Sequence, residues 1–556
     1  MKRLIAAFLQ ARRKRGFAAF RARCYDTRRA QEALLLRLVA RNGDTALARR
    51  LGVPSLRTLD DLRRLPLTDY DAIAPEIAAA LAGKPDQLVA GRPGFFGMTS
   101  GTSGRAKYIP IDDAYRAEFQ STVQHFLYGV VRDHPRALAH KALYLVAPAV
   151  CEVTAGGEPA GAISGHNLRR LPHLLRSFYA VPADAFEVPN PARQTYAVAR
   201  FALATELSIA FSVTTAPLAV IGATIEQHTE ALLRDIHDGT LAVDGIPEPL
   251  HRSLTRGLRP DPRRARTLAA RVAGGKRPTP ANFFPHLALV ACWNHAGAAN
   301  RLAAVRDLWG EVPIRPAIYS ATEGWMNIPL RDHHPSGVLA VDAVVLEFMD
   351  ADGRTRFAHE LDTPGRYEVL LTSGAGLWRY RVGDEVEVTG FFEHAPGQPG
   401  QPGQPGNPGQ PEEGGQTGRP PGRAPELHFV QKTGNVLSLA HDMTTEAQVR
   451  KAVAVALPHV GRWVFGPAPS GDRYRLVVEG DVAAEATTAL ATALDCALAA
   501  ANLGYDEDRA DGQIQPLDLA LRSAADFDAW EAGRRTAAVA QAKPTVFVKS
   551  AAELPP

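Results

Sequence analysis

Within the segment 95–110, every residue from Thr99 to Gly104 carries a hydroxyl or is a glycine, which is the composition of a phosphate-binding loop. Glycine lets the backbone approach a ligand closely, and hydroxyls and free N–H groups can then converge on one anion, to which Lys107 would add a point charge. The order G-x-x-G-x-x-K is not a Walker A loop, because Tyr108 stands where that loop has Ser or Thr. We predict a phosphate cradle; the alternative is a Ser/Gly-rich surface turn. The cradle residues, all Thr, Ser or Gly, are Thr99, Ser100, Gly101, Thr102, Ser103 and Gly104.

Two further motifs follow apolar, strand-like segments. Tyr319-Ser-Ala-Thr-Glu-Gly324 comes after one segment, and Trp378-Arg-Tyr-Arg-Val-Gly-Asp384 ends another. Ligands of α/β sheets bind outside the carboxyl ends of strands, so both motifs are well placed for a binding site. Taken singly, each has a plain structural explanation, since Asp384 after glycine is typical of a turn, Glu323 could end a strand and Tyr319 could be a core residue. A third motif, Gln541-Ala-Lys543, contains one of only ten lysines in the chain.

Composition excludes several classes of protein. The 556 residues are 46% hydrophobic and 22% charged, which is typical of a soluble globular protein. A net charge of +4, from 63 basic and 59 acidic residues, gives no reason to expect nucleic-acid binding. The four cysteines form no C-x-x-C pair, which argues against zinc and disulfides and for a reducing, cytoplasmic location. No apolar run approaches about 18 residues, so we expect no membrane-spanning helix; the basic N-terminal segment is read as a surface helix, with an amphipathic membrane anchor as the alternative.

The order of strand-like and helical segments predicts an α/β fold. Residues 1–395 would form a large domain with β-sheets flanked by helices. Its last part, from residue 337, has successive strand-like runs, including 377–382 and 385–392 with a turn between them, and would form a barrel-like subdomain. Residues 396–425 contain five Gly-Gln/Asn-Pro triplets and are expected to be a disordered loop. Residues 426–556 would then form a small, mobile α/β domain.

Together, these motifs are similar to those of the acyl acid amido synthetases of the auxin-responsive promoter (Gretchen Hagen) family. The chain resembles a bacterial-type member of that family. That family is an outlying branch of the adenylate-forming superfamily, with the acyl-CoA ligases and luciferase. Its phosphate loop is similar to residues 99–107, its Tyr-x-x-Ser/Thr-Glu motif to residues 319–323, and its Tyr-Arg-x-Gly-Asp motif to residues 380–384. The resemblance also includes the approach segment Leu65-Pro-Leu-Thr-Asp-Tyr70. The chain departs from the family in its Pro-rich tract, and in Gln541-Ala-Lys-Pro-Thr-Val546, where the family has Gln-x-Lys-x-Pro-Arg.

The resemblance implies ATP-dependent activation of a carboxylic acid to acyl-AMP with release of pyrophosphate. The acyl group would then be transferred to an amine, which we expect to be that of an amino acid. The implied cofactors are ATP and Mg²⁺, and the implied partners are a small carboxylic acid and an amine or amino acid; we expect no nucleic acid, no stable membrane insertion and a monomer. Two alternatives stay open: a ligase that delivers the acyl group to coenzyme A or a carrier thiol, and a nucleotide-binding scaffold without catalysis.

The resemblance also implies a role for each motif residue. Glu323 would bind the magnesium ion, which suits one or two carboxylates plus phosphates, and Asp384 would bind the ribose hydroxyls. Tyr319 would stack on adenine. Lys543, on the mobile domain, would approach the α-phosphate, with a hinge between Asp384 and about Lys432. The remaining assignments are Thr322 and Lys107 as catalytic residues, Ser320 and Lys432 in the nucleotide site, and Trp325 and His295 near the substrate, with His295 as a candidate base.

Overall fold

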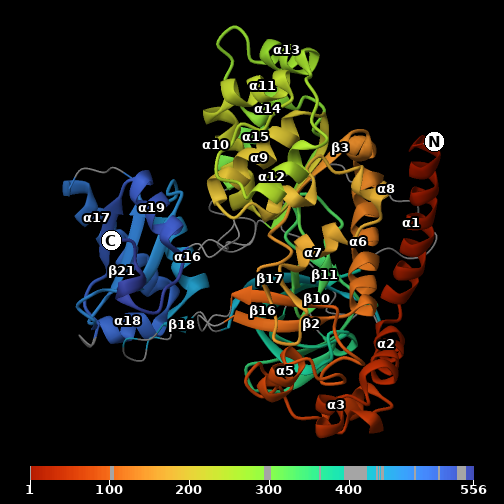
Figure 1. Ribbon diagram of the computed structural model, residues 1–556. Helices are drawn as coiled ribbons and strands as arrows, with labels where there is room; N and C mark the ends of the chain where they lie inside the picture. Colours follow the sequence, from red (N-terminus) through yellow and green to blue (C-terminus); the bar gives the residue numbers. More distant parts are fainter. Residues whose placement is uncertain are drawn as a thin grey trace, which may run out of the picture.

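The computed structural model describes residues 2–100, 106–293, 302–361, 365–392, 422–433, 436–437, 439, 442, 444–480, 484–510, 514–534 and 546–556. A large body carries the N-terminus, and a smaller body, drawn in blue in Figure 1, lies beside it. Within the described residues, no helix is both long enough and apolar enough to cross a membrane.

A parallel sheet forms part of the large body, and its first strand, β3, is labelled beside the helices of the upper lobe in Figure 1. Its order is β3-β6-β7-β8, and all three pairings are parallel. The strands are β3 (Lys141–Leu145), β6 (Leu207–Thr214), β7 (Leu289–Trp293) and β8 (Ile314–Pro316). Alternate residues of β6 and β7 pack in two different cores, because successive side chains of a strand point to opposite faces. The sheet is therefore buried on both faces, which confirms the predicted α/β fold.

Helices cover the two faces of this sheet. The helix α6 (Asp113–Asp133) shares its core with Ile209 and Ala291 on one face, while α9, α10 and α15 share theirs with Ala210 and Val290 on the other. The helices of the upper lobe are α9 (Pro191–Leu203), α10 (Thr215–Gln227), α11 (Thr229–Asp238), α12 (Glu248–Thr255), α13 (Pro262–Arg271), α14 (Pro280–Phe283) and α15 (Leu302–Trp309). The short helices α7 (Ile163–Arg169) and α8 (His173–Arg176) lie nearer α6 (Figure 1).

The expected phosphate cradle belongs to a small second sheet of order β2-β1-β5-β4. Its strands are β1 (Phe95–Ser100), β2 (Ala106–Ile111), β4 (Glu152–Val153) and β5 (Pro159–Gly161). β1 and β2 are antiparallel, with Thr99 opposite Lys107 and Ser100 opposite Ala106. We call β1, β2 and the residues between them the phosphate hairpin. Residues 101–105 lie outside the described residues, so Gly101, Thr102, Ser103 and Gly104 remain predictions.

A seven-stranded sheet of order β11-β12-β17-β16-β15-β13-β14 closes the large body. All of its pairings are antiparallel. The strands are β11 (Asn327–Ile328), β12 (Gly337–Leu339), β13 (Val344–Met349), β14 (Thr355–Phe357), β15 (Gly365–Ser373), β16 (Leu377–Phe391) and β17 (Pro425–Lys432). The two short strands expected at 377–382 and 385–392 are one strand, because Gly383 adopts φ 72° and a register shift opposite β15 absorbs the irregularity.

The N-terminal helices pack onto the large body. α1 (Lys2–Cys24) lies along α6 (Figure 1), and Phe17, Phe20 and Cys24 are buried in the shared core. This packing favours a docked surface helix for the basic N-terminal segment. The helices that follow are α2 (Thr27–Asn42), α3 (Ala46–Leu51), α4 (Leu59–Arg63) and α5 (Ala74–Leu81).

The smaller body has hydrophobic cores of its own, and every described residue in them comes from Leu437 onward. It holds the strand order β20-β21-β22, with β20 (Trp463–Pro467), β21 (Tyr474–Glu479) and β22 (Asp518–Arg522), and the two-stranded pair β18 (Val436–Leu437) and β19 (Thr444–Thr445). Its helices are α16 (Glu446–Ala456), α17 (Ala484–Ala501), α18 (Leu503–Ala510) and α19 (Ala524–Arg534). Because β17 pairs with β12 and β16 of the large body, we propose that the small domain begins after Lys432. The Pro-rich tract lies almost wholly outside the described residues.

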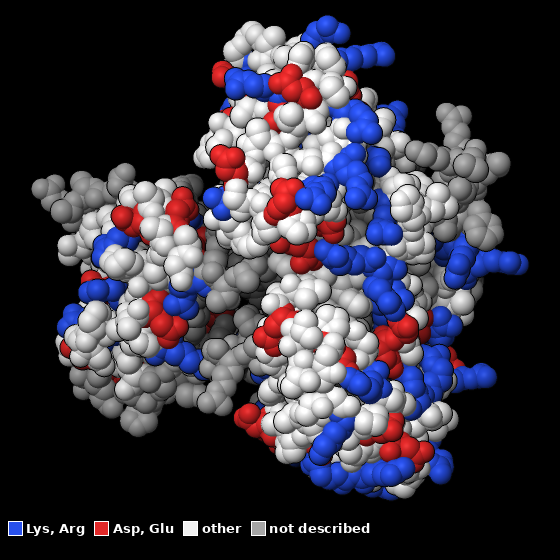
Figure 2. All heavy atoms as spheres, viewed as in Figure 1, with Lys and Arg blue, Asp and Glu red and all other residues white. Residues whose placement is uncertain are grey.

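Charges of both signs share the surface. On the face shown in Figure 2, Lys and Arg gather in a band down the large body, with Asp and Glu interspersed. Exposed arginines at the end of α7 are paired: Arg169 with Asp184 at 3.0 Å, and Arg170 with Asp113 at 2.9 Å. Such pairing is typical of a solvated face.

Candidate active site

Three of the expected nucleotide-site residues meet at the end of β17. The Tyr319 hydroxyl donates to Oδ2 of Asp384 at 2.7 Å, and the Lys432 ammonium pairs with Oδ1 of the same carboxylate. Asp384 and Lys432 face each other across β16 and β17, and Asp384 is only 2% exposed. Burial alone would lower the pKa of Lys432, but the Asp384 carboxylate outweighs it and raises that pKa. The structure therefore brings together Tyr319, Asp384 and Lys432, which lie far apart in the sequence.

An aromatic cluster surrounds Tyr319. Its ring centroid lies 5.9 Å from that of Trp293, at the end of β7, and 5.6 Å from that of Phe429 in β17. Trp293 and Phe429 meet edge to face at 5.3 Å. Burial, followed by the Asp384 carboxylate, raises the pKa of Tyr319 well above its usual range. An aromatic cluster beside a carboxylate has the chemistry expected of a base-and-ribose site. Sequence reasoning assigned no role to Trp293 or Phe429.

Thr322 and Glu323 form the turn between β9 (Ser320–Ala321) and β10 (Gly324–Trp325). Buried side chains hold this turn from two sides: Tyr115 of α6 donates to the Thr322 carbonyl at 2.9 Å, and Ser373 of β15 donates to the Glu323 carbonyl at 2.7 Å. Glu323 is 6% exposed. The turn is thus a rigid support for a carboxylate.

The turn also contacts the phosphate hairpin. A Cβ atom on Gly97 of β1 would lie 2.3 Å from Cγ2 of Thr322. Only glycine permits this approach, because real Cβ atoms do not come so close to another atom. Gly97 therefore sets the hairpin directly against Thr322, so the expected phosphate and metal ligands share one region. The Glu323 carboxylate with phosphate oxygens would be a hard, oxygen-only donor set, which fits Mg²⁺; the described residues alone include no group of three or more His, Cys, Asp or Glu able to hold a metal ion.

Tyr70 braces the other strand of the hairpin. The Tyr108 N–H donates to the Tyr70 hydroxyl at 2.9 Å, and the Lys107 ammonium lies 5.4 Å from the centre of the Tyr70 ring. A cation over an aromatic face is attracted by the ring. Tyr70 ends the approach segment that was recognised in the sequence, but nothing in the sequence alone assigned it this contact.

The approach segment is itself attached to β16. The Thr68 N–H donates to the Arg379 carbonyl at 3.1 Å, the Arg381 N–H donates to the Thr68 carbonyl at 2.8 Å, and the Thr68 hydroxyl donates to the Trp378 carbonyl at 2.7 Å. Thr68 thus extends the sheet by one bridge, beside Tyr380. As a result, β16 positions both Asp384 and the support of the phosphate hairpin.

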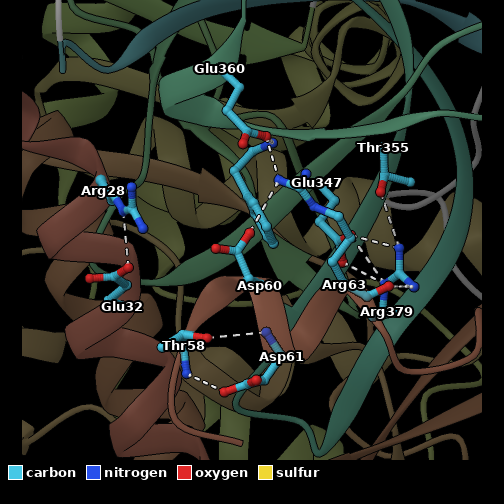
Figure 3. A network of polar contacts seen from close by, with 11 residues as sticks. Arg28, Glu32, Thr58, Asp60, Asp61, Arg63, Glu347, Thr355, Glu360 and Arg379 are labelled. Atoms are coloured by element: carbon cyan, nitrogen blue, oxygen red, sulfur yellow. Dashed lines mark hydrogen bonds and ion pairs between the residues drawn. The ribbon is translucent and has the colours of Figure 1, made fainter.

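Arg379 lies at the centre of a buried polar network, shown in Figure 3. Its Nε lies 2.9 Å from Oε1 of Glu347, its Nη2 lies 2.8 Å from Oε2, and its Nη1 donates to the carbonyls of Arg63, at 2.6 Å, and Leu65. We call these groups the Arg379 network. Arg379 has a φ of 47°, which is rare for any residue other than glycine. The network fixes the end of α4 and the start of the approach segment to the seven-stranded sheet.

The other predicted residues are less completely placed. Trp325 is 4% exposed and packs against Phe119 of α6, with ring centroids 4.3 Å apart. Ser320 begins β9 and is exposed. Thr99 and Ser100 are placed in β1 by their backbone only. His295 and Lys543 lie outside the described residues, so their roles remain predictions.

Comparisons with known proteins agree with the motifs. The chain matches the GH3 family N-terminal domain over residues 17–314, the GH3 family central domain over 337–398 and the GH3 family C-terminal domain over 451–552. A jasmonoyl–L-amino acid synthetase of Oryza sativa subsp. japonica, GH3.5, is 24% identical over 552 residues, covering 89% of this chain and 87% of the relative. A probable indole-3-acetic acid-amido synthetase of Arabidopsis thaliana, GH3.1, is 24% identical over 442 residues, covering 76% and 70%.

The fold has a solved counterpart. The structure of an acyl acid amido synthetase, AtGH3.15 in complex with 2,4-DB, covers 98% of this chain and 95% of its own, with a TM-score of 0.79 at 16% identity. At that identity the likeness concerns the fold. The resemblance drawn from the motifs is confirmed at the level of the family, while the expected bacterial type stays a prediction.

Proposed function

Because the chain belongs to the GH3 family, we propose that it joins a carboxylic acid to an amine in two steps, the first of which consumes ATP. In the first, a carboxylate oxygen attacks the α-phosphorus of ATP, the bond to the β-phosphate oxygen breaks, and pyrophosphate leaves. In the second, the amine nitrogen attacks the acyl carbon, the bond to the AMP oxygen breaks, and the amine loses a proton. The observation that carries this proposal is the meeting of Asp384, Tyr319 and the Thr322–Glu323 turn beside the phosphate hairpin.

The residues of this chain would position and stabilise charge, which is most of the catalysis in phosphoryl-type transfer. Asp384 would accept hydrogen bonds from the ribose hydroxyls, exchanging them for the contact with Tyr319. The cradle hydroxyls and Lys107 would bind the β- and γ-phosphates. Glu323 would hold Mg²⁺, which neutralises phosphate charge when bound.

Lys432 lies at the position where we propose the hinge of the small domain. It binds Asp384 at the last residue of β17, where the chain leaves the seven-stranded sheet. Soon afterwards Thr445 caps the start of α16, with its N–H donating to Oε1 of Gln448 at 2.8 Å, and the Ala447 N–H donates to Oε1 of Gln431 at 3.2 Å. We place the hinge here, so that movement of the small domain carries Lys543 toward or away from the α-phosphate.

The acceptor is proposed to be an amino acid. The names of both curated relatives describe ligation to an amine, one of them to L-amino acids. An amine attacks acyl-AMP readily when water is kept out, but it is mostly protonated at pH 7, so it needs a base; His295 is our candidate. We further propose a monomer in the cytoplasm, with all four cysteines free.

ATP–pyrophosphate exchange across aryl, indolyl and aliphatic acids tests the first step. The Ser100→Ala and Thr102→Ala variants should each lower exchange about 10²–10³-fold, as the loss of a transition-state donor does. Exchange at the wild-type rate in both variants would overturn the cradle. For the second step, the best acid is supplied with MgATP and either amino acids or coenzyme A. Faster formation of thioester than of amide would refute the amide product and favour an acyl-CoA ligase.

A further inference from the structure

The hydroxyl of Tyr380 is buried without a partner. Tyr380 is only 1% exposed, and its Oη makes no hydrogen bond in the part of the chain that the structure describes. A buried hydroxyl without a partner is unfavourable, because it has lost its hydrogen bonds to water. Tyr380 begins the Tyr-Arg-x-Gly-Asp motif, yet none of the roles assigned to that motif uses its hydroxyl.

The surrounding strands fix the direction of the side chain. Tyr380 lies opposite Leu371 of β15, and side chains of such cross-strand neighbours share a face of the sheet. Leu371 faces the metal-site turn, because its Cδ2 would lie 3.4 Å from a Cβ on Gly324, the residue after Glu323. On the other edge of β16, Tyr380 forms an isolated parallel β-bridge with Thr68, which lies two residues before Tyr70. Tyr380 therefore lies between the support of Glu323 and the support of the phosphate hairpin.

The electrostatic surroundings agree with this placement. Burial raises the pKa of Tyr380 above its usual range, and the Glu323 carboxylate and then the Tyr70 hydroxyl add to that effect. The hydroxyl consequently stays protonated at physiological pH and remains able to donate. The Tyr380 hydroxyl is a neutral hydrogen-bond donor between the Glu323 carboxylate and the predicted phosphate cradle. Such a donor suits a phosphate oxygen that arrives together with Mg²⁺.

We propose that the Tyr380 hydroxyl is a nucleotide-binding group that donates a hydrogen bond to a triphosphate oxygen of MgATP beside Glu323. This inference rests on the proposed function, since the nucleotide supplies the acceptor. In the free protein the hydroxyl is kept without a partner, and binding of MgATP satisfies it. The Tyr380 hydroxyl would then stabilise the complex with MgATP and slightly destabilise the nucleotide-free protein.

The Tyr380→Phe variant separates these two states. Removal of an unpartnered hydroxyl should leave the melting temperature of the free protein unchanged or slightly higher. The same change should weaken MgATP binding about tenfold, because hydrogen bonds to charged groups are stronger than neutral ones, and so reduce the rise in melting temperature that MgATP produces. The matched control is Tyr367→Phe, a buried tyrosine on β15 opposite Val386, which should leave MgATP binding unaltered.

Each outcome decides the question. Wild-type affinity for MgATP in Tyr380→Phe would overturn the inference and leave the proposed function intact. A clear fall in the melting temperature of the free variant would show that the hydroxyl is already bonded there, and would also overturn it. If the wild-type protein showed no response to MgATP, the proposed function and this inference would fail together. A tenfold loss with an unchanged free protein, and no loss in Tyr367→Phe, supports the assignment.

Discussion

Replacing Arg379 by methionine tests the energetic role of the Arg379 network. Methionine keeps most of the aliphatic stem and removes only the guanidinium, and the positive φ of 47° is imposed on both residues alike. Arg379 and Glu347 are 5% and 2% exposed, so the carboxylate that remains would be buried without its partner. The carbonyls of Arg63 and Leu65 would lose a donor at the same time.

The expected loss of stability is large. Breaking a buried ion pair by removing one partner costs about 3–5 kcal/mol, and the two abandoned carbonyls place this variant toward the upper end. Replacing both partners, in Arg379→Met with Glu347→Leu, should recover much of the loss, since no charge is then left buried. The double variant therefore distinguishes loss of an ion pair from loss of packing volume.

The neighbouring arginine on the same strand provides the control. Arg381 forms a similar two-pronged pair with Glu368, at 2.9 and 2.8 Å, but its side chain is 46% exposed. Exposed pairs contribute about 0–1 kcal/mol, so Arg381→Met should be nearly neutral. Urea unfolding followed by tryptophan fluorescence compares the midpoints of both variants. An Arg379→Met variant that loses no more stability than Arg381→Met would refute the reasoning from burial.

Three other predictions concern pH, the Pro-rich tract and the small domain. Burial, and then the neighbouring arginines, lower the pKa of His166 to about 4; the unfolded chain, with a pKa near 6.5, then binds more protons between these values, so stability falls as pH falls through that window. His166→Phe should flatten this fall in melting temperature between pH 7 and 5, and an unchanged slope would contradict the assignment. Deleting residues 397–420 should leave turnover and melting temperature nearly intact, because loop length costs only about 0.6 kcal/mol per doubling; the cut spares Gly422, whose carbonyl accepts from the Thr27 N–H at 2.8 Å. Lys543→Ala should slow pyrophosphate exchange far more than Lys549→Ala, an exposed change nearby, and equal effects would remove Lys543 from the mechanism.

The sequence by itself determined the fold class and the family. Alternating apolar and helical segments are local patterns, so they predict α/β architecture without knowledge of long-range contacts. The Tyr319, Glu323 and Asp384 motifs were recognisable because each is short and contiguous, and their order along the chain identified the family. Sequence also predicts a solvated Gly-Pro tract, since that composition buries little apolar surface; this stays a prediction, because the tract lies almost wholly outside the described residues.

Only the tertiary structure decided which distant residues share a site. Residues 65 positions apart, Tyr319 and Asp384, are joined by one hydrogen bond, and Gly97 is recognisable as the contact with Thr322 only once β1 lies against that turn. Arg379 finds Glu347 and the carbonyls of Arg63 and Leu65 across three separate segments. No local pattern encodes such pairings, because they depend on strand register and on the positive φ at Arg379.

The same reason explains where sequence reasoning went astray or stopped short. A Gly-Asp pair is typical of a turn, but in β16 a positive φ at Gly383 and pairing on both edges keep the strand continuous. Tyr70 and Tyr380 belong to motifs recognised in the sequence but had no assigned role, and their position between the phosphate hairpin and Glu323 depends on the bridge between Thr68 and Tyr380. Chain composition and local spacing thus determined the chemistry available, while strand pairing determined which groups could act together.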